Sequence, residues 1–104
     1  NDLWAFLRAL IGDREAAEAR LLRPEMAKSM WGPQLPAIDE EVGLHMFLLH
    51  RSHQLWGHDG GEEGVATVMA FNPETKAGAI LLANQGDADL DELLEEAYEL
   101  ARKW

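Results

Sequence analysis

The chain has 104 residues, of which 47% are hydrophobic and 27% are charged, and its formal net charge is −10. A chain of this length forms one domain at most and buries about two-thirds of its unfolded surface. The negative charge argues against nucleic acid as a partner, because phosphate contacts need Lys and Arg. No apolar run approaches the ~20 residues of a membrane span, and no signal peptide is expected at the N-terminus. The absence of Cys excludes disulfides and thiolate metal ligands.

The N-terminal third is predicted to form two short helices. Apolar residues at helical spacing follow Asp2 and stop at Gly12, which indicates a first helix between these two residues. Residues 13–20 are rich in Ala and Glu and are interpreted as helical or as an ordered connection. A second helix is expected to begin at Pro24, which suits a first helical position. It should end near a loop over residues 32–41, where two prolines interrupt regular structure.

The middle of the chain is predicted to form an antiparallel sheet of three to four strands. Arg51 and Ser52 would join the first two strands in a tight turn, but they lack the glycine typical of such turns, so a longer loop is equally compatible. Pro73 marks a turn between the last two strands. The strand candidates are residues 42–50, 54–58, 65–71 and 78–84.

A C-terminal helix is expected from Asp89 to Trp104, with a capping-box-like start made by Asp89 and Glu92. Its apolar stripe should place Leu94 and Trp104 in the core, while its many acidic side chains are interpreted as a solvated face. Helices, then strands, then a covering helix define an α+β domain whose sheet is covered on one face by the C-terminal helix.

Glycine is concentrated at the centre of the predicted sheet. Four glycines lie within residues 57–64, around the single residue His58. Because glycine weakens a strand, this cluster suggests that a ligand or a second backbone approaches closely. A structural interpretation is also open: His58 could be a hydrogen-bonded strand-end residue, and Gly60, Gly61 and Gly64 could be turn glycines.

Residues 57–84 resemble the serine β-lactamases and penicillin-binding proteins, and most closely the class C β-lactamase-like branch with its esterases and D-amino peptidases. In that family a Lys-Thr-Gly or His-x-Gly motif precedes a glycine-rich turn, a strand, a Pro-Glu hairpin and a strand ending in Asn. A weaker resemblance covers nearly the whole chain, where Gly43-Leu44-His45-Met46 departs from a family Gly-Leu-Gly-Trp strand at its second Gly. The matching features are His58-Asp59-Gly60, Gly61-Glu62-Glu63-Gly64, residues 65–71, Asn72-Pro73-Glu74-Thr75 and residues 79–84.

The resemblance implies roles for five residues. Gly61 would donate its backbone N–H to the oxyanion that forms during acyl transfer, as a catalytic group. His58 would hydrogen-bond the substrate or a second-motif residue, and it could carry a proton near neutral pH. Asp59 and Gly60 would line the substrate, with Gly60 leaving the strand free of a side chain. Asn84 would approach the acidic group of the substrate, although it could equally cap the strand.

The nucleophile expected for this chemistry is missing. The family uses a serine in Ser-x-x-Lys and a Tyr or Ser in a second motif. Neither Ser29 nor Ser52 has Lys three residues later, and Tyr98 lies inside the predicted C-terminal helix. The chain is therefore interpreted as the C-terminal part of a larger β-lactamase-like domain, inactive alone and without a cofactor. The resemblance implies a bacterial source and leaves the compartment open.

The sequence is also compatible with an interaction module, and its histidines raise the question of a metal site. A non-catalytic interaction module would use residues 78–84 as an exposed apolar edge, which would bind the missing N-terminal portion or a second copy. Four histidines, a common type of metal ligand, lie between residues 45 and 58. In a tight hairpin His50 would face His53 and His45 would face His58, but the two pairs would lie ~17 Å apart. No native metal site is therefore expected.

Overall fold

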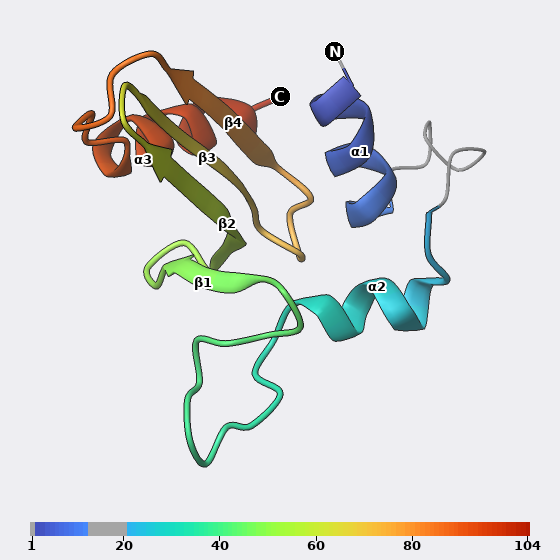
Figure 1. The fold of residues 1–104 in the computed structure, drawn as a ribbon. Coiled ribbons are helices and arrows are strands. Elements are labelled where there is room, and N and C mark those ends of the chain that lie inside the picture. The colour runs from blue at the N-terminus through green and yellow to red at the C-terminus, as the bar shows by residue number, and fades with distance from the viewer. Residues whose placement is uncertain (1, 13–20) are drawn as a thin grey trace.

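The computed structural model describes residues 2–12 and 21–104, and its elements follow the predicted order of helices, strands and a final helix. The described residues form an α+β fold, which confirms the predicted fold class (Figure 1). Its elements are α1 (Asp2–Ile11), α2 (Pro24–Met30), β1 (Phe47–His50), β2 (Leu55–Glu62), β3 (Val65–Phe71), β4 (Gly78–Ala83) and α3 (Asp91–Ala101).

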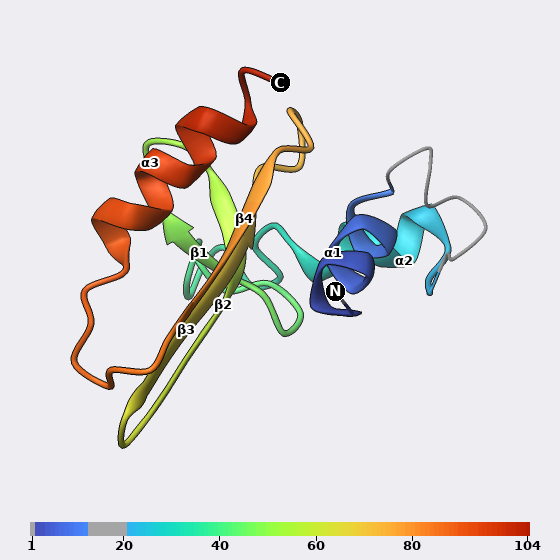
Figure 2. The same ribbon diagram turned by 90° about the horizontal axis from the view of Figure 1, so that it is seen from above.

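The four strands form one antiparallel sheet in the order β1-β2-β3-β4. Strands β2, β3 and β4 pair along most of their length. Strand β1 is shorter and pairs only with the first residues of β2, where Phe47 lies opposite Gly57 and His50 opposite Leu55. Figure 2 shows α3 on one side of this sheet and α1 and α2 on the other side.

Apolar side chains pack on both faces of the sheet, as the period-2 alternation of a strand dictates. In β3, Val68 and Ala70 face α3, whereas Met69 and Phe71 face α1. The core against α3 is built from Leu55, Val68, Ala70, Ala79, Leu94 and Tyr98. The core against α1 is built from Leu7, Leu10, Ile11, Met46, Trp56 and Phe71.

The helical predictions for the N-terminal third hold in the described residues. Helix α1 ends at Ile11, directly before Gly12 with its φ of +72°, and α2 begins at Pro24. The prediction for residues 13–20 lies outside the described residues. In the part of the chain that the structure describes, none of the helices combines the length and the apolar character that crossing a membrane requires.

Two strand predictions were wrong in their extent. Residues 42–50 were expected to form one strand, but the strand begins at Phe47, since His45 has a φ of +63° that interrupts extended backbone. Strand β2 is longer than expected and continues through the glycines to Glu62. The predicted glycine-rich turn at residues 61–64 is reduced to Glu63 and Gly64, because the backbone of residues 61 and 62 still pairs with β3.

The loop between β1 and β2 has four residues, Arg51 to Gln54, rather than two. The sequence left this alternative open, and the structure selects the longer loop. Gln54 closes it with a φ of +51°, and its side chain donates a hydrogen bond to the carbonyl of Arg51 at 2.8 Å.

The predictions for the ends of the C-terminal helix were also wrong. Helix α3 begins at Asp91 after the N-cap residue Leu90, so the expected capping box of Asp89 and Glu92 does not form. Instead, the Asp89 carboxylate accepts a hydrogen bond from the Asp91 N–H at 3.1 Å. Trp104, expected in the core, is fully exposed because the helix ends three residues earlier.

Candidate functional site

The predicted site residues 58–61 lie in the second half of β2, where every side chain is exposed. The first half of the strand, up to Gly57, is buried between β1 and β3. Beyond Gly57, β2 keeps its partner β3 but has no pairing with β1. Among the described residues, the outer backbone edge of this half therefore has no strand neighbour.

The backbone N–H of Gly61 points toward this open edge. The two-residue turn after β2 closes the pair Glu62 and Val65, which must be a hydrogen-bonded pair because only two residues separate the partners. Hydrogen-bonded and non-hydrogen-bonded pairs alternate along an antiparallel ladder. Gly61, opposite Ala66, is therefore in a non-hydrogen-bonded pair, and its N–H and C=O are directed away from β3. A ligand at the open edge can accept a hydrogen bond from this N–H.

The glycines of β2 differ in what the fold demands of them. A Cβ on Gly57 would lie 1.9 Å from the Met69 carbonyl oxygen, so only glycine fits against β3 there. A Cβ on Gly60 would meet the Thr67 hydroxyl at 2.8 Å. A Cβ on Gly61 would meet nothing within 4 Å. The absence of a side chain at Gly61 is thus not required by packing, and it leaves the edge accessible.

The two nitrogens of the His58 ring differ in their contacts with the described residues. Its Nδ1 lies 2.6 Å from the Asp59 carbonyl oxygen, which can only accept, so Nδ1 must carry the hydrogen. In the neutral ring, Nε2 then has the lone pair, and no contact of the described residues occupies it. The ring is flanked by His45 and Phe47, each with a ring centroid 5.4 Å away.

The structure separates Asp59 and Asn84 from the His58 ring. Strand alternation places the Asp59 side chain on the α3 face and His58 on the opposite face, with Trp56. Asn84 follows β4, whose residue Ala83 pairs with Ala66 of β3, so it lies two strands away from β2, at about 10 Å. His58, Gly60 and Gly61 are therefore brought together on one strand, whereas Asn84 stands apart.

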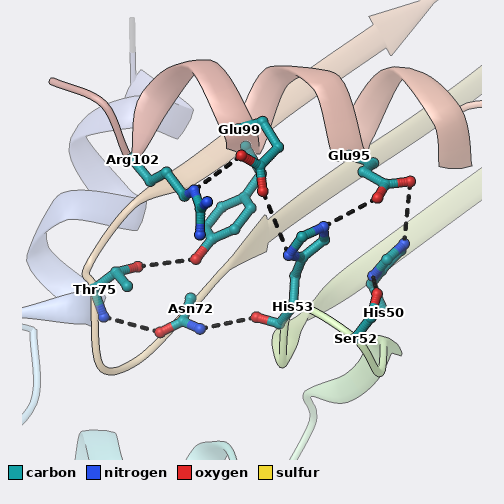
Figure 3. A network of polar contacts seen from close by, with 9 residues as sticks. His50, Ser52, His53, Asn72, Thr75, Glu95, Glu99 and Arg102 are labelled. Carbon is teal, nitrogen blue, oxygen red and sulfur yellow. Dashed lines mark hydrogen bonds and ion pairs between the residues drawn. The ribbon is translucent and has the colours of Figure 1, made fainter.

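A second group of polar residues joins the β1–β2 loop to α3 (Figure 3). The rings of His50 and His53 stack with centroids 5.0 Å apart, so this predicted pair forms although the loop is longer than a tight turn. Both rings face the carboxylate of Glu95, with His53 Nε2 at 3.1 Å and His50 Nε2 at 3.8 Å. His53 Nδ1 lies 3.6 Å from Glu99, which also pairs with Arg102 at 2.9 Å.

Sequence reasoning missed these carboxylate partners. They lie more than forty residues from the histidines, and a Glu at positions 95 and 99 indicates only a shared helix face. Among the described residues, no three His, Asp or Glu side chains are placed to hold one metal ion.

The two serines and a cavity lie elsewhere. Ser29 Oγ donates to the Met26 carbonyl at 2.6 Å within α2, and Ser52 Oγ contacts His50 Nδ1 at 3.1 Å in the β1–β2 loop. A cavity of about 210 Å³ lies between α1, α2 and the β3–β4 turn, near Trp31 and Lys76. It does not include residues 58–61.

Comparison with known proteins identifies the family. The model of the Beta-lactamase family matches residues 1–102, nearly the full length of the chain. The chain therefore belongs to the β-lactamase family, as the sequence resemblance predicted. The searches of curated proteins and of solved structures found no match.

Proposed function

We propose that the chain is the C-terminal part of a β-lactamase-like serine hydrolase and forms one wall of its acyl-transfer site. In this proposal a β-lactam, an ester or a D-amino peptide lies along the open edge of β2. The nucleophilic serine belongs to polypeptide outside residues 1–104. The observation that carries the proposal is the outward direction of the Gly61 N–H on an edge that, among the described residues, has no strand neighbour.

Gly61 would stabilise the oxyanion, because negative charge develops on the acyl oxygen as the serine attacks. A backbone N–H already aimed at that oxygen needs no reorganisation during the reaction. Loss of one such donor typically lowers kcat by about 10²–10³-fold. The open space at the Cβ position of Gly61 supports this role, since a substrate can reach the backbone.

His58 would act as hydrogen-bond acceptor or proton carrier through its free Nε2. The Asp59 carbonyl holds the hydrogen on Nδ1, so the opposite nitrogen can accept a proton from a hydroxyl group. Gly60 and the backbone of Asp59 would line the substrate beside it. Asn84 would contact an acidic group of the substrate only if the ligand extends about 10 Å across the sheet.

Neither serine of the chain suits the nucleophile. Ser29 bonds its own helix backbone at 2.6 Å, and Ser52 lies in the loop before β2, beside His50. We therefore expect no hydrolysis of a chromogenic β-lactam or a short-chain aryl ester by the purified chain. Robust turnover that persists in the Ser29→Ala/Ser52→Ala variant would contradict the assignment of the nucleophile to other polypeptide.

The positive test expresses the chain together with an N-terminal polypeptide that carries the Ser-x-x-Lys motif of the family. Hydrolysis should appear in the combination, and Gly61→Pro should reduce kcat by about 10²-fold or more because proline has no N–H. Gly61→Ala is the matched control, since it keeps the N–H and meets nothing within 4 Å. Equal activity of the Pro and Ala variants would remove Gly61 from the oxyanion site.

A second function, an interaction module without catalysis, is favoured by one observation. Strand β4 pairs only with β3 among the described residues, and its Leu82 is exposed. An unpaired apolar edge can add a strand from another chain. The partner would be the missing N-terminal portion or a second copy of this chain. Light scattering that gives a monomer at high concentration, with slow amide exchange at residues 79–83, would contradict it.

A further inference from the structure

The turn before β1 contains a strained residue that touches the candidate site. His45 has a φ of +63°, in the left-handed region that non-glycine residues rarely occupy. Such backbone persists only where the surroundings hold it, and it is concentrated at functional sites. The ring of this residue lies against His58, with centroids 5.4 Å apart and planes 36° apart.

The turn that carries His45 is firmly held. Gly43 and Met46 are buried, and the Gly43 N–H donates to the Met46 carbonyl at 2.8 Å. A Cβ on Gly43 would lie 2.4 Å from the Met30 carbonyl oxygen, so α2 fixes this side of the turn. The Leu48 N–H donates to the Glu41 carbonyl at 2.8 Å and fixes the other side. The left-handed residue at the apex is therefore placed by its neighbours.

His58 is exposed, and three contacts restrict its ring. The Asp59 carbonyl binds Nδ1, His45 packs beside the ring, and Phe47 meets it edge to face with planes 70° apart. An exposed imidazole without neighbours turns freely about its last side-chain torsion, which is broad. Such rotation would break the Nδ1 contact, so the hydrogen would no longer be held on Nδ1 and could move to Nε2 through solvent.

We propose that His45 is a positioning residue which, with Phe47, holds His58 in the Nδ1–H tautomer and keeps the Nε2 lone pair available. The ligand class is one that presents a hydroxyl or another hydrogen-bond donor to Nε2. The use of the Nε2 lone pair rests on the proposed function. The ring arrangement itself is a property of this chain without a ligand. His45 itself need not contact the substrate.

The test compares His45→Gly with wild type by long-range ¹H–¹⁵N NMR of the imidazoles at alkaline pH. Wild type should show His58 as one Nδ1–H tautomer. In His45→Gly the two His58 nitrogen resonances should move toward each other as the tautomers exchange. The melting temperature should rise by about 4 °C, because glycine relieves the left-handed strain.

Two variants make the outcome specific. Gln54→Gly also replaces a left-handed residue, with a φ of +51°, but lies in the β1–β2 loop away from His58. It should leave the His58 nitrogen shifts unchanged. His45→Phe keeps a flat ring at the same place and should retain the single tautomer. If His45→Gly does not fold, Phe47→Leu provides the same readout, with tautomer exchange expected.

Unchanged His58 nitrogen shifts in His45→Gly, or in Phe47→Leu where that variant replaces it, would overturn the positioning role. They would not affect the proposed function, which the hydrolysis and Gly61→Pro experiments test. Failure of those experiments would conversely leave the tautomer result standing.

Discussion

The two halves of β2 belong to one strand and share one partner, β3, yet they have opposite surroundings. Residues 55–57 are buried, with β1 on one edge and α3 or α1 against each face. Residues 58–62 are exposed, and their outer edge has no strand neighbour among the described residues. Pairing with β3 alone therefore keeps the second half extended, and its other edge stays available to a ligand.

The two histidine pairs differ in the same way. His50 and His53, beside the buried half, face the carboxylates of α3 and are about four-fifths buried at their side chains. His45 and His58, beside the open half, contact each other, and His58 also contacts Phe47. The first pair therefore ties the β1–β2 loop to α3, whereas the second pair is arranged around a free nitrogen.

One added methyl group should have very different effects in the two halves of β2, and the effect at Gly57 should exceed that of every other variant described below. Gly57→Ala should destabilise the fold by about 4 kcal/mol or more, because its Cβ would lie 1.9 Å from a backbone oxygen that cannot move aside. Gly61→Ala should change the unfolding free energy by less than about 0.5 kcal/mol. Urea denaturation followed by circular dichroism measures both. Similar values for the two variants would remove the distinction between the halves.

An intermediate effect is expected at Asn72. Asn72 is buried; its amide donates to the His53 carbonyl at 2.8 Å, and its oxygen accepts from the Glu74 N–H and the Thr75 N–H (Figure 3 shows the Thr75 bond). Asn72→Ala should lower the unfolding free energy by about 2 kcal/mol, because buried groups lose their partners.

Asn84→Ala is the matched control for that variant. Asn84 directly follows β4 and is exposed, and its replacement should change the unfolding free energy by less than about 0.5 kcal/mol. A loss at Asn84 as large as that at Asn72 would mean that this end of the sheet is held more tightly than its exposure indicates.

The smallest effect is expected at the histidines. His53→Ala should lower the unfolding free energy by about 1 kcal/mol, since the ring bonds Glu95 at 3.1 Å and packs on Tyr98. His58→Ala should leave stability within about 0.5 kcal/mol of wild type. Thermal melts of His53→Ala and His58→Ala measure the difference in stability between the two variants. Adding Glu95→Gln to His53→Ala tests whether the effect at His53 depends on its Glu95 partner. A His58 variant that melts below the His53 variant would reverse the comparison.

The resemblance and the periodicity predicted which helices and strands form better than they predicted where those elements end. Apolar residues alternate in residues 65–71 and recur at helical spacing after Asp2. Each pattern marks the face that the element buries, so the strand and the helix could be predicted. Trp104 was misplaced because an apolar residue at helical spacing does not reveal where the helix stops. The end of β2 was misplaced because glycines suggested a turn, whereas the backbone of β3 decided that the strand continues.

The fold class and the family could be predicted from the amino-acid sequence alone, because they follow from local periodicity and from the order of short motifs. The same motifs predict the site residues His58, Asp59, Gly60 and Gly61. The tertiary structure added that the Gly61 N–H points outward, that Asp59 and His58 lie on opposite faces and that His45 has left-handed backbone. Those facts depend on strand register and on a left-handed residue, and one residue of register shift would reverse every face of the strand.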